Sequence, residues 1–260
     1  MECERTFLVV SSVRSGSTWL ETMLGSLADV TVDFEFKWIP EYYAYTPEPV
    51  HKHIPNSSFS CQTALTEIAG ETLIKGSKLT LEACPHLDHE FADLKQTVDS
   101  EIRIIHLRRR YRDVYLSLIR GCMHLVDRNS VGFDDSSNSV ILNAILEIEK
   151  QVIETMDKPP FVADTKFCRM VMESLVANDR WAESLRENRR HFFTIDYNNV
   201  HADFHKMASF IGSKASQKEL DTVLKCPLTK KLPKWPFRER IKNYNEVEKI
   251  IEEYEGSIHF

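Results

Sequence analysis

Apolar residues along the chain fall into two patterns, which predict strands and helices in alternation. Short apolar runs rich in β-forming residues predict strands at residues 6–11, 72–77, 102–107 and 192–196. The runs at 6–11 and 102–107 are each followed by a short polar segment and then by apolar residues at helical spacing. Strand, loop and helix in this order predict an α/β fold in which helices flank a central parallel sheet.

The longer elements are predicted by helical spacing. After the first strand, apolar positions recur at this spacing over residues 19–27. Comparable repeats predict helices at about 111–124, 140–155 and 166–187, and a charged helix follows a Lys/Pro-rich segment near the end of the chain. Residues 30–65 are aromatic and interrupted by prolines, so we expect them to be irregular.

The composition is that of a folded, soluble protein. The 260 residues are 42% hydrophobic, and 33 Lys and Arg against 39 Asp and Glu leave a net charge of −6. With no internal repeat and no linker, we expect a single domain over residues 1–260. A mildly acidic total gives no general field for nucleic acid, and no apolar window reaches the length of a membrane span. We therefore expect no nucleic-acid partner and no membrane partner.

The cysteines and the N-terminus predict a cytoplasmic location. Six cysteines are scattered along the chain without a Cys-x-x-Cys pair or a His at zinc-finger spacing. This pattern is typical of reduced intracellular thiols rather than of a disulfide framework or a structural zinc site. The first residues are not basic and become apolar only at Phe7, so they do not resemble a secretory signal.

One candidate site lies between the first predicted strand and the first predicted helix. The junction reads Arg14-Ser15-Gly16-Ser17-Thr18-Trp19. Small residues here leave backbone N–H groups able to converge on an anion, and the helix N-terminus adds its dipole. The hydroxyls and the guanidinium add donors suited to phosphate. No Lys precedes the Ser/Thr as a Walker A loop requires. The junction is therefore an anion site of another kind, or a plain turn capped by Ser17.

A second candidate site follows the strand at 102–107. Five arginines fall within ten residues, namely Arg103, Arg108, Arg109, Arg110 and Arg112. In a chain that is acidic overall, such a cluster at the carboxyl end of a strand is better explained by a bound phosphate than by an exposed basic helix face. A nuclear-localisation signal is a weaker interpretation because apolar residues flank the run.

Together these motifs resemble those of the sulfotransferases that use 3′-phosphoadenosine 5′-phosphosulfate (PAPS). Residues 14–20 match the family's first-loop pattern, Arg/Lys-Ser-Gly-Ser/Thr-Thr-x-Leu, and Arg109, Asp113 and Ser117 match its RxxxDxxxS pattern. The stretch 232–244 is similar to the C-terminal segment of bacterial members. The resemblance implies a P-loop-nucleotide-hydrolase-like sulfotransferase fold and the transfer of a sulfuryl group.

The resemblance also assigns the donor contacts. The first loop would hold the 5′-phosphosulfate through Arg14, Ser15, Gly16, Ser17 and Thr18. Arg109 and Ser117 would hold the 3′-phosphate, and Tyr197 would lie near the adenine. Trp19 either stacks on the adenine or packs in the core. The first-loop cation would act on the transferring group, and no metal is required.

The chain departs from the cytosolic animal members at the catalytic residues. Those members carry a Lys-Thr-His triplet whose His is the base, and the comparable stretch here, residues 74–79, has no His. Lys75 matches the family's Lys and is expected to neutralise the transferring sulfuryl group, with Lys78 as a second candidate. The dimer motif of the same members is missing, so the resemblance implies no oligomeric state.

In bacterial and carbohydrate-sulfating relatives a Glu just after the first helix acts as the base, and Glu35 occupies that place. Asp33 is the second choice, since alternation puts it on the same face of an extended segment. Both carboxylates could instead be solvated. The further alternatives are His51, His53, His86 and His106, although His106 lies within an apolar strand and is expected to be a core residue.

The expected acceptor is a small molecule, as in natural-product tailoring, because aromatics at 34–45 and a polar segment at 127–138 could line its entrance. Attack by a hydroxyl or an amine is left open. One competing function is a P-loop-type kinase or nucleotidyl transferase, which the missing Walker A lysine argues against. The other is an inactive nucleotide-binding module, which the two intact phosphate motifs argue against.

Overall fold

The computed structural model describes residues 5–33, 61–68, 70–81, 98, 100–125, 160–187, 191–225 and 236–256. Several predictions lie outside the described residues. These are the base Glu35, the alternatives His51, His53 and His86, the helix at 140–155, and the segments 34–45 and 127–138.

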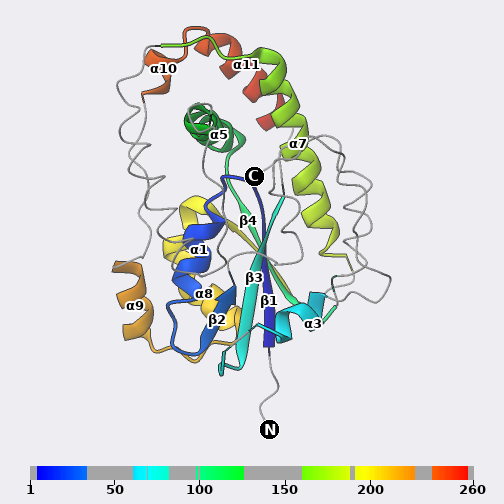
Figure 1. The fold of residues 1–260 in the computed structure, drawn as a ribbon, viewed down its shortest axis with the longest axis vertical. Helices are drawn as coiled ribbons and strands as arrows, with labels where there is room; N and C mark the ends of the chain where they lie inside the picture. The colour runs from blue at the N-terminus through cyan, green and yellow to red at the C-terminus, as the bar shows by residue number, and fades with distance from the viewer. Residues whose placement is uncertain are drawn as a thin grey trace. The chain divides into compact units, whose positions relative to one another are not determined.

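A five-stranded parallel sheet organises the fold (Figure 1). Its order is β2 (Val30–Asp33), β3 (Ile74–Leu81), β1 (Arg5–Ser12), β4 (Arg103–Arg108) and β5 (Phe192–Asp196). Every neighbouring pair is parallel, as the alternation of strand and helix patterns predicts. The predicted α/β fold is confirmed. Because β1 lies between β3 and β4, the first motif leaves from the middle of the sheet's carboxyl edge.

The prediction that residues 30–65 are irregular is wrong at both ends of that segment. β2 has only four residues, too few to show an alternating pattern, and it forms by pairing along its whole length with β3. The short helix α3 (Cys61–Thr66) closes the segment. β3 runs four residues beyond its predicted end, because polar positions there alternate with the buried Leu79 and Leu81.

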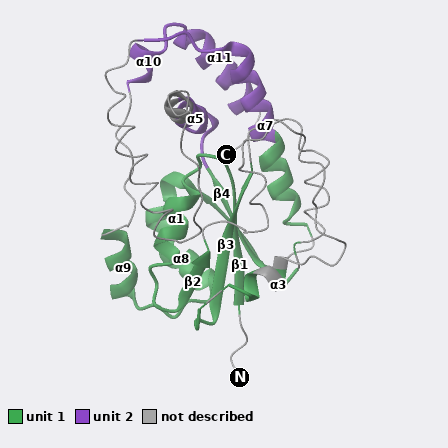
Figure 2. Ribbon diagram, in the orientation of Figure 1, with its two compact units in different colours: residues 1–82, 86–108, 177–228 green, residues 83–85, 109–176, 229–260 purple. Residues whose placement is uncertain are grey.

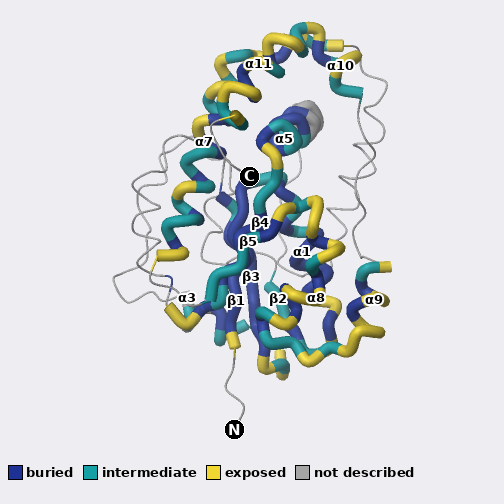
Figure 3. The backbone as a smooth tube through the Cα atoms, turned by 180° about the vertical axis from the view of Figure 1, so that it is seen from behind, coloured by how far each residue is buried: buried dark blue, intermediate teal, exposed yellow. Residues whose placement is uncertain are grey.

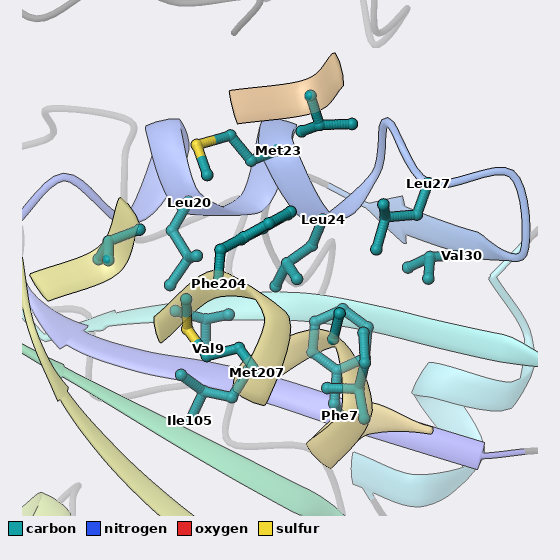
Figure 4. Packing of buried hydrophobic residues seen from close by; sticks show 14 of the residues in the cluster. Phe7, Val9, Leu20, Met23, Leu24, Leu27, Val30, Ile105, Phe204 and Met207 are labelled. Atoms are coloured by element: carbon teal, nitrogen blue, oxygen red, sulfur yellow. The ribbon is translucent and has the colours of Figure 1, made fainter. Parts of the chain in front are cut away.

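Three helices cover one face of the sheet: α1 (Ser17–Leu24), α8 (Val200–Ile211) and α9 (Gln217–Lys225). Strand side chains alternate between faces, and Phe7, Val9 and Ile105 point to this one. They pack against Leu20 of α1 and Phe204 of α8 in one apolar cluster (Figure 4). The sequence analysis did not identify α8 or α9. The packing nevertheless fixes α1, and with it the first loop, on the sheet.

The N-terminus of α9 is stabilised by a reciprocal cap. The Ser216 hydroxyl and backbone N–H both donate to Glu219 Oε2 at 2.7 Å, and the Glu219 N–H donates back to Ser216 Oγ at 3.4 Å. This is the capping-box arrangement. These hydrogen bonds to the carboxylate lower the pKa of Glu219.

The opposite face of the sheet packs on α3 and on the C-terminal part of α7 (Thr165–Ser184). Leu8, Val10 and Ile104 point to this side and join Leu65 of α3 and Ala182 of α7 in a second cluster. Seen from behind, the strands run as a buried band between partly exposed helices (Figure 3). The sheet is therefore covered on both faces, as parallel sheets generally are.

The chain divides into two compact units (Figure 2). The first holds the sheet and comprises residues 1–82, 86–108 and 177–228, and the second comprises residues 83–85, 109–176 and 229–260. The chain passes between the units several times, and a single domain over 1–260 stays a prediction. Among the described residues, no helix is long and apolar enough to cross a membrane.

The second unit contains α5 (Tyr111–Leu125), the first part of α7, α10 (Phe237–Arg240) and α11 (Tyr244–Glu255). Its helices pack around their own apolar cluster, which includes Tyr115, Cys168 and Val247. Burial raises the pKa of the Cys168 thiol to about 11 and also raises the pKa of Tyr115. The predictions of helices at 111–124 and 166–187 are confirmed within a few residues.

Candidate active site

The first loop leaves the carboxyl end of β1 and turns directly into α1. The Val13 N–H donates to the Leu81 carbonyl at 2.8 Å, and the Ser15 N–H donates back to the Ser12 carbonyl at 3.2 Å. These bonds hold the turn against the end of β3. The loop is compact, and Ser15 is almost fully buried.

Two residues of the loop have a left-handed backbone. Arg14 has φ 61°, and it is the one non-glycine residue with positive φ in the part of the chain that the structure describes. Gly16 has φ 90° and is the N-cap of α1. The alternative of a plain turn capped by Ser17 is therefore wrong: Ser17 is already helical, and no side chain caps this helix. A strained non-glycine conformation of this kind is found preferentially at functional sites.

The first hydrogen bond within α1 determines which backbone donors the helix start offers. The first bond within α1 runs from the Leu20 N–H to the Gly16 carbonyl at 3.1 Å. The N–H groups of Ser17, Thr18 and Trp19 therefore have no acceptor within the helix. With the helix dipole behind them and the Arg14 guanidinium in the same loop, this junction has the chemistry of a phosphate or sulfate site.

Tyr197 packs on the loop from the end of β5. It opens the short helix η2 (Tyr197–Asn199), and a Cβ at Gly16 would lie 2.4 Å from its Cε2 atom. The Tyr197 and Trp19 rings lie 5.5 Å apart between centroids, and Trp19 and His201 lie 5.3 Å apart. The structure thus brings together Gly16, Trp19 and Tyr197, which are 181 positions apart at most in the sequence.

Trp19 belongs to the core rather than to an open surface. Its side chain is 7% exposed and packs in the apolar cluster between α1 and α8. Of the two interpretations that the sequence leaves open, core packing is what the structure shows. Tyr197 is only partly buried, and its place near the adenine stays a prediction.

Lys78 reaches the loop from β3. Its Nζ donates to Thr18 Oγ1 at 2.8 Å and lies 3.8 Å from Glu21 Oε2. Lys78 is 7% exposed and Glu21 is 0% exposed. Because Lys78 pairs with Val9 in the register of β1 and β3, it points to the face that α1 covers. The Lys78 ammonium group therefore contacts the first turn of α1.

Lys75 points elsewhere. It lies three residues before Lys78 on the same strand, so the two side chains leave on opposite faces. Its Nζ donates to the Thr66 carbonyl of α3 at 2.7 Å, and its strand position is level with Thr6, at the opposite end of β1 from the loop. The structure brings Lys78 to the first loop and does not bring Lys75 there.

Asp33 ends β2 and pairs in register with Ser77. Val30 belongs to the cluster under α1, and Val32 packs against it. Alternation therefore puts Asp33 on the other face of the sheet, away from Lys78. Asp33 is partly exposed. The structure does not bring it to the loop.

Arg109 and Ser117 lie in the second unit. Arg109 follows directly after β4, which ends at Arg108 and whose Leu107 pairs with Ser11 of β1. Ser117 lies in the second turn of α5, and both residues are partly buried. Their assignment to a 3′-phosphate stays a prediction.

The end of β4 is anchored to α7 by a network centred on His106. His106 is 1% exposed, and its ring nitrogens lie 3.4 Å from Asp179 Oδ1 and 3.2 Å from Glu183 Oε1. Arg108 Nε lies 3.8 Å from the other oxygen of Asp179. The expectation that His106 is a core residue is confirmed. Its environment is polar, and it braces the strand that leads to Arg109.

The sequence analysis missed two residues that contact this region. Asn178 of α7 is 2% exposed, and its Nδ2 lies 3.3 Å from both Ser12 Oγ and the Leu81 carbonyl. It ties the ends of β1 and β3 beneath the loop. Glu21 is the other, and its spacing of three residues from Thr18 is the signal that puts both on one side of a helix. Among the described residues no His, Cys, Asp and Glu side chains gather in a group that could hold a metal ion.

Comparisons with known proteins give, for most of the chain, the same family that its sequence motifs resemble. A family model described as sulfotransferase domain matches residues 4–232. No curated protein matches the sequence. Among solved structures, a sulfotransferase from Alicyclobacillus acidocaldarius is 15% identical, with a TM-score of 0.44 over 86% of this chain and 90% of that one.

Two further solved structures are similar at the same level. The sulfotransferase domain from the Synechococcus PCC 7002 olefin synthase is 11% identical, with a TM-score of 0.45 over 100% of this chain and 90% of that one. Mouse sulfotransferase SULT7A1 complexed with PAP is 14% identical, with a TM-score of 0.41 over 99% of this chain and 90% of that one.

Proposed function

Because the chain belongs to the sulfotransferase domain family, we propose that it transfers the sulfuryl group of PAPS to a hydroxyl or amine of a small-molecule acceptor. The observation that carries this proposal is the junction of β1 and α1, where Arg14 precedes the helix N-terminus by two residues and Lys78 donates to Thr18 in the first turn. Such a loop suits a doubly charged anion without requiring a metal ion.

The residues of the loop have distinct roles in this proposal. The backbone N–H groups of residues 16–18 and the hydroxyls of Ser17 and Thr18 hold the 5′-phosphate of the donor. Arg14 and Lys78 are the cations proposed to stabilise the charge that develops on the leaving phosphate. We assign to Lys78 the role that the resemblance gives to Lys75, because Lys78 is the lysine bonded to the loop.

The 3′-phosphate of the donor is assigned to Arg109 and Ser117 on the strength of their motif. A guanidinium offers paired donors to phosphate, and a hydroxyl near the start of α5 adds another. The His106 network supports this assignment indirectly, because it fixes the end of the strand that precedes Arg109. Tyr197 is proposed to contact the adenine.

The transfer step is an in-line displacement. The acceptor oxygen or nitrogen forms a bond to sulfur while the bond between sulfur and the 5′-phosphate oxygen breaks. The phosphate keeps the electron pair of that bond, so adenosine 3′,5′-bisphosphate leaves, and the acceptor's proton passes to the base. Glu35 is proposed as this base from its place after the first helix. Asp33, the second choice from the sequence, is not proposed because it points to the face of the sheet away from Lys78. A cytoplasmic location remains part of the proposal.

Thermal unfolding in the presence of nucleotides tests this function. Adenosine 3′,5′-bisphosphate at about one hundred times its Kd should raise the free energy of unfolding by about 2.7 kcal/mol. In a chain of this size the melting temperature then rises by about 5–10 °C. ATP with Mg²⁺ should have no comparable effect. Stabilisation by ATP and Mg²⁺, without stabilisation by the bisphosphate, would instead support a kinase or nucleotidyl transferase.

A further inference from the structure

Glu21 is a carboxylate enclosed within the fold. It lies on α1 at 0% exposure, among the apolar residues that pack this helix on the sheet. Burying an ionised carboxylate is costly, and a buried ion pair seldom offsets the cost better than apolar side chains of the same size would. Stability therefore gives a poor reason for an acid at this position, and its neighbours suggest a different one.

The carboxylate and the loop hydroxyl hold the same ammonium group. Lys78 Nζ lies 3.8 Å from Glu21 Oε2 and 2.8 Å from Thr18 Oγ1. Thr18 and Glu21 are three residues apart on α1, so they lie on one side of the helix and meet the lysine together. A lysine side chain has four rotatable bonds, and two contacts from one rigid helix restrict its freedom strongly.

The direction of the hydrogen bond determines what Thr18 can do. An ammonium group has three donors and no acceptor, so Thr18 Oγ1 must accept from Lys78. The hydroxyl proton of Thr18 is then available to a second acceptor. Thr18 lies in the first turn of α1, where anions bind, and a hydroxyl that accepts from a cation is a stronger donor.

We propose that Glu21 is a positioning residue that holds the Lys78 ammonium on Thr18, so that the Thr18 hydroxyl and the lysine charge are aligned with the donor's 5′-phosphosulfate. This inference rests on the proposed function. Glu21 touches neither donor nor acceptor and acts through Lys78. The negative charge of Glu21 also offsets the positive charge of Lys78. The site therefore binds the leaving bisphosphate less tightly.

The proposal gives opposite signs for turnover and for binding. In Glu21→Gln the ammonium loses its second contact, and kcat for transfer should fall by about 10- to 100-fold, as small misalignments do. The loop also loses a negative charge, so adenosine 3′,5′-bisphosphate should bind equally well or up to several-fold more tightly. A merely structural role would lower turnover, binding and melting temperature together.

A double-mutant cycle tests whether Glu21 acts through Lys78. Glu21→Gln, Lys78→Met and the double variant are compared by kcat and by the Kd of the bisphosphate. We expect the double variant to be no slower than Lys78→Met alone, because the carboxylate has no target once the ammonium is gone. Losses that multiply would overturn the proposal, and so would a Kd that rises in proportion to the fall in kcat. Glu253→Gln is the matched control, since it removes a carboxylate from an exposed ion pair, that of Glu253 with Arg169, to which no role in the site is assigned. It should leave kcat unchanged in either background.

A second readout needs no activity and separates failure of this inference from failure of the proposed function. Reductive methylation with formaldehyde, read by mass spectrometry, should modify Lys78 several-fold faster in Glu21→Gln than in the wild type. Lys75 serves as the internal control in the same digest, because its bond to the Thr66 carbonyl is unaffected. Equal rates at Lys78 would overturn the inference whether or not the wild type transfers sulfate. If Glu21→Gln does not fold, Glu21→Asp enters both experiments, with a smaller change of the same sign in each.

Discussion

The ring of Tyr197 occupies the space that any side chain at position 16 would need. A Cβ at Gly16 would lie 2.4 Å from Cε2 and 2.7 Å from Cδ2 of Tyr197, and the backbone of Gly16 has φ 90°. Position 16 therefore requires glycine for two independent reasons, one conformational and one steric. The same contact joins the first loop to the end of β5, so the shape of the anion site depends on two distant parts of the chain.

We predict that Gly16→Ala damages the site through both effects. The left-handed backbone alone costs about 1 kcal/mol for alanine, and displacement of the Tyr197 ring adds to it. Melting temperature should fall by several degrees, and affinity for adenosine 3′,5′-bisphosphate should fall with it, as measured by calorimetry. Adding Tyr197→Ala relieves the clash but not the backbone strain, so it should restore part of the lost stability. Full stability in the single variant would contradict this account of the loop.

The two buried lysines of β3 should behave differently when each is replaced by methionine. Lys78→Met removes the cation bonded to Thr18, so kcat for sulfuryl transfer should fall by about 10²-fold. The melting temperature should fall as well, because the buried Glu21 carboxylate loses its Lys78 partner. Lys75→Met leaves the Thr66 carbonyl without its donor and should lower stability by about 1–3 kcal/mol, with kcat retained. A loss of kcat in the folded Lys75→Met variant, with kcat retained in Lys78→Met, would return the catalytic role to Lys75.

The 3′-phosphate assignment predicts selectivity between two ligands. Arg109→Ala should weaken binding of adenosine 3′,5′-bisphosphate by about 2–3 kcal/mol, the range for losing a charge-assisted contact. Adenosine 5′-phosphosulfate lacks the 3′-phosphate, so its affinity should change much less. Arg110 is exposed and adjacent, and Arg110→Ala is the control for general loss of charge. Equal losses for both ligands would remove Arg109 from the 3′-phosphate.

Cys168 should be unreactive at moderately alkaline pH. Burial raises the pKa of its thiol to about 11, against about 8.5 in an unfolded chain. At pH 8.5 iodoacetamide should therefore modify it about a hundredfold more slowly in the folded protein than in urea. Because the folded pKa is the higher one, the associated stability is complete below pH 8.5 and is lost as the pH rises toward 11. Rapid labelling of Cys168 in the folded protein would show that it is not buried as described.

The sequence predicted the strands that carry a continuous apolar run. β1 and β4 have such runs and are largely buried, whereas β5 lies at the edge of the sheet and has only Ile195 buried. β2 has four residues and depends on its pairing with β3, which no local pattern reveals. The helix α8 was missed although Val200, Phe204, Met207 and Ile211 recur at helical spacing. The apolar spacing of α8 could therefore have been recognised from the sequence.

The site was predictable where it is local and was not where it depends on packing. Residues 14–19 are contiguous, and the structure places them at the junction of β1 and α1, as the strand, small-residue and helix patterns indicate. Lys75 and Lys78 both fit the sequence pattern, and alternation shows only that they leave on opposite faces. Which face α1 covers is decided by the three-dimensional packing of Leu20 and Phe204. For Glu21 and Asn178 the sequence shows only their positions along helices, and it does not show that they are buried.

The central claim is that this chain moves a sulfuryl group from PAPS. We would incubate the protein with ³⁵S-labelled PAPS and a fractionated small-molecule extract, and follow the label by chromatography. The account predicts a new labelled product, formed together with adenosine 3′,5′-bisphosphate. Glu35→Gln should form it about 10²–10⁴ times more slowly, the usual worth of a positioned base. Tight binding of the bisphosphate with no label transferred to any fraction would contradict the account and leave a nucleotide-binding module without transferase activity.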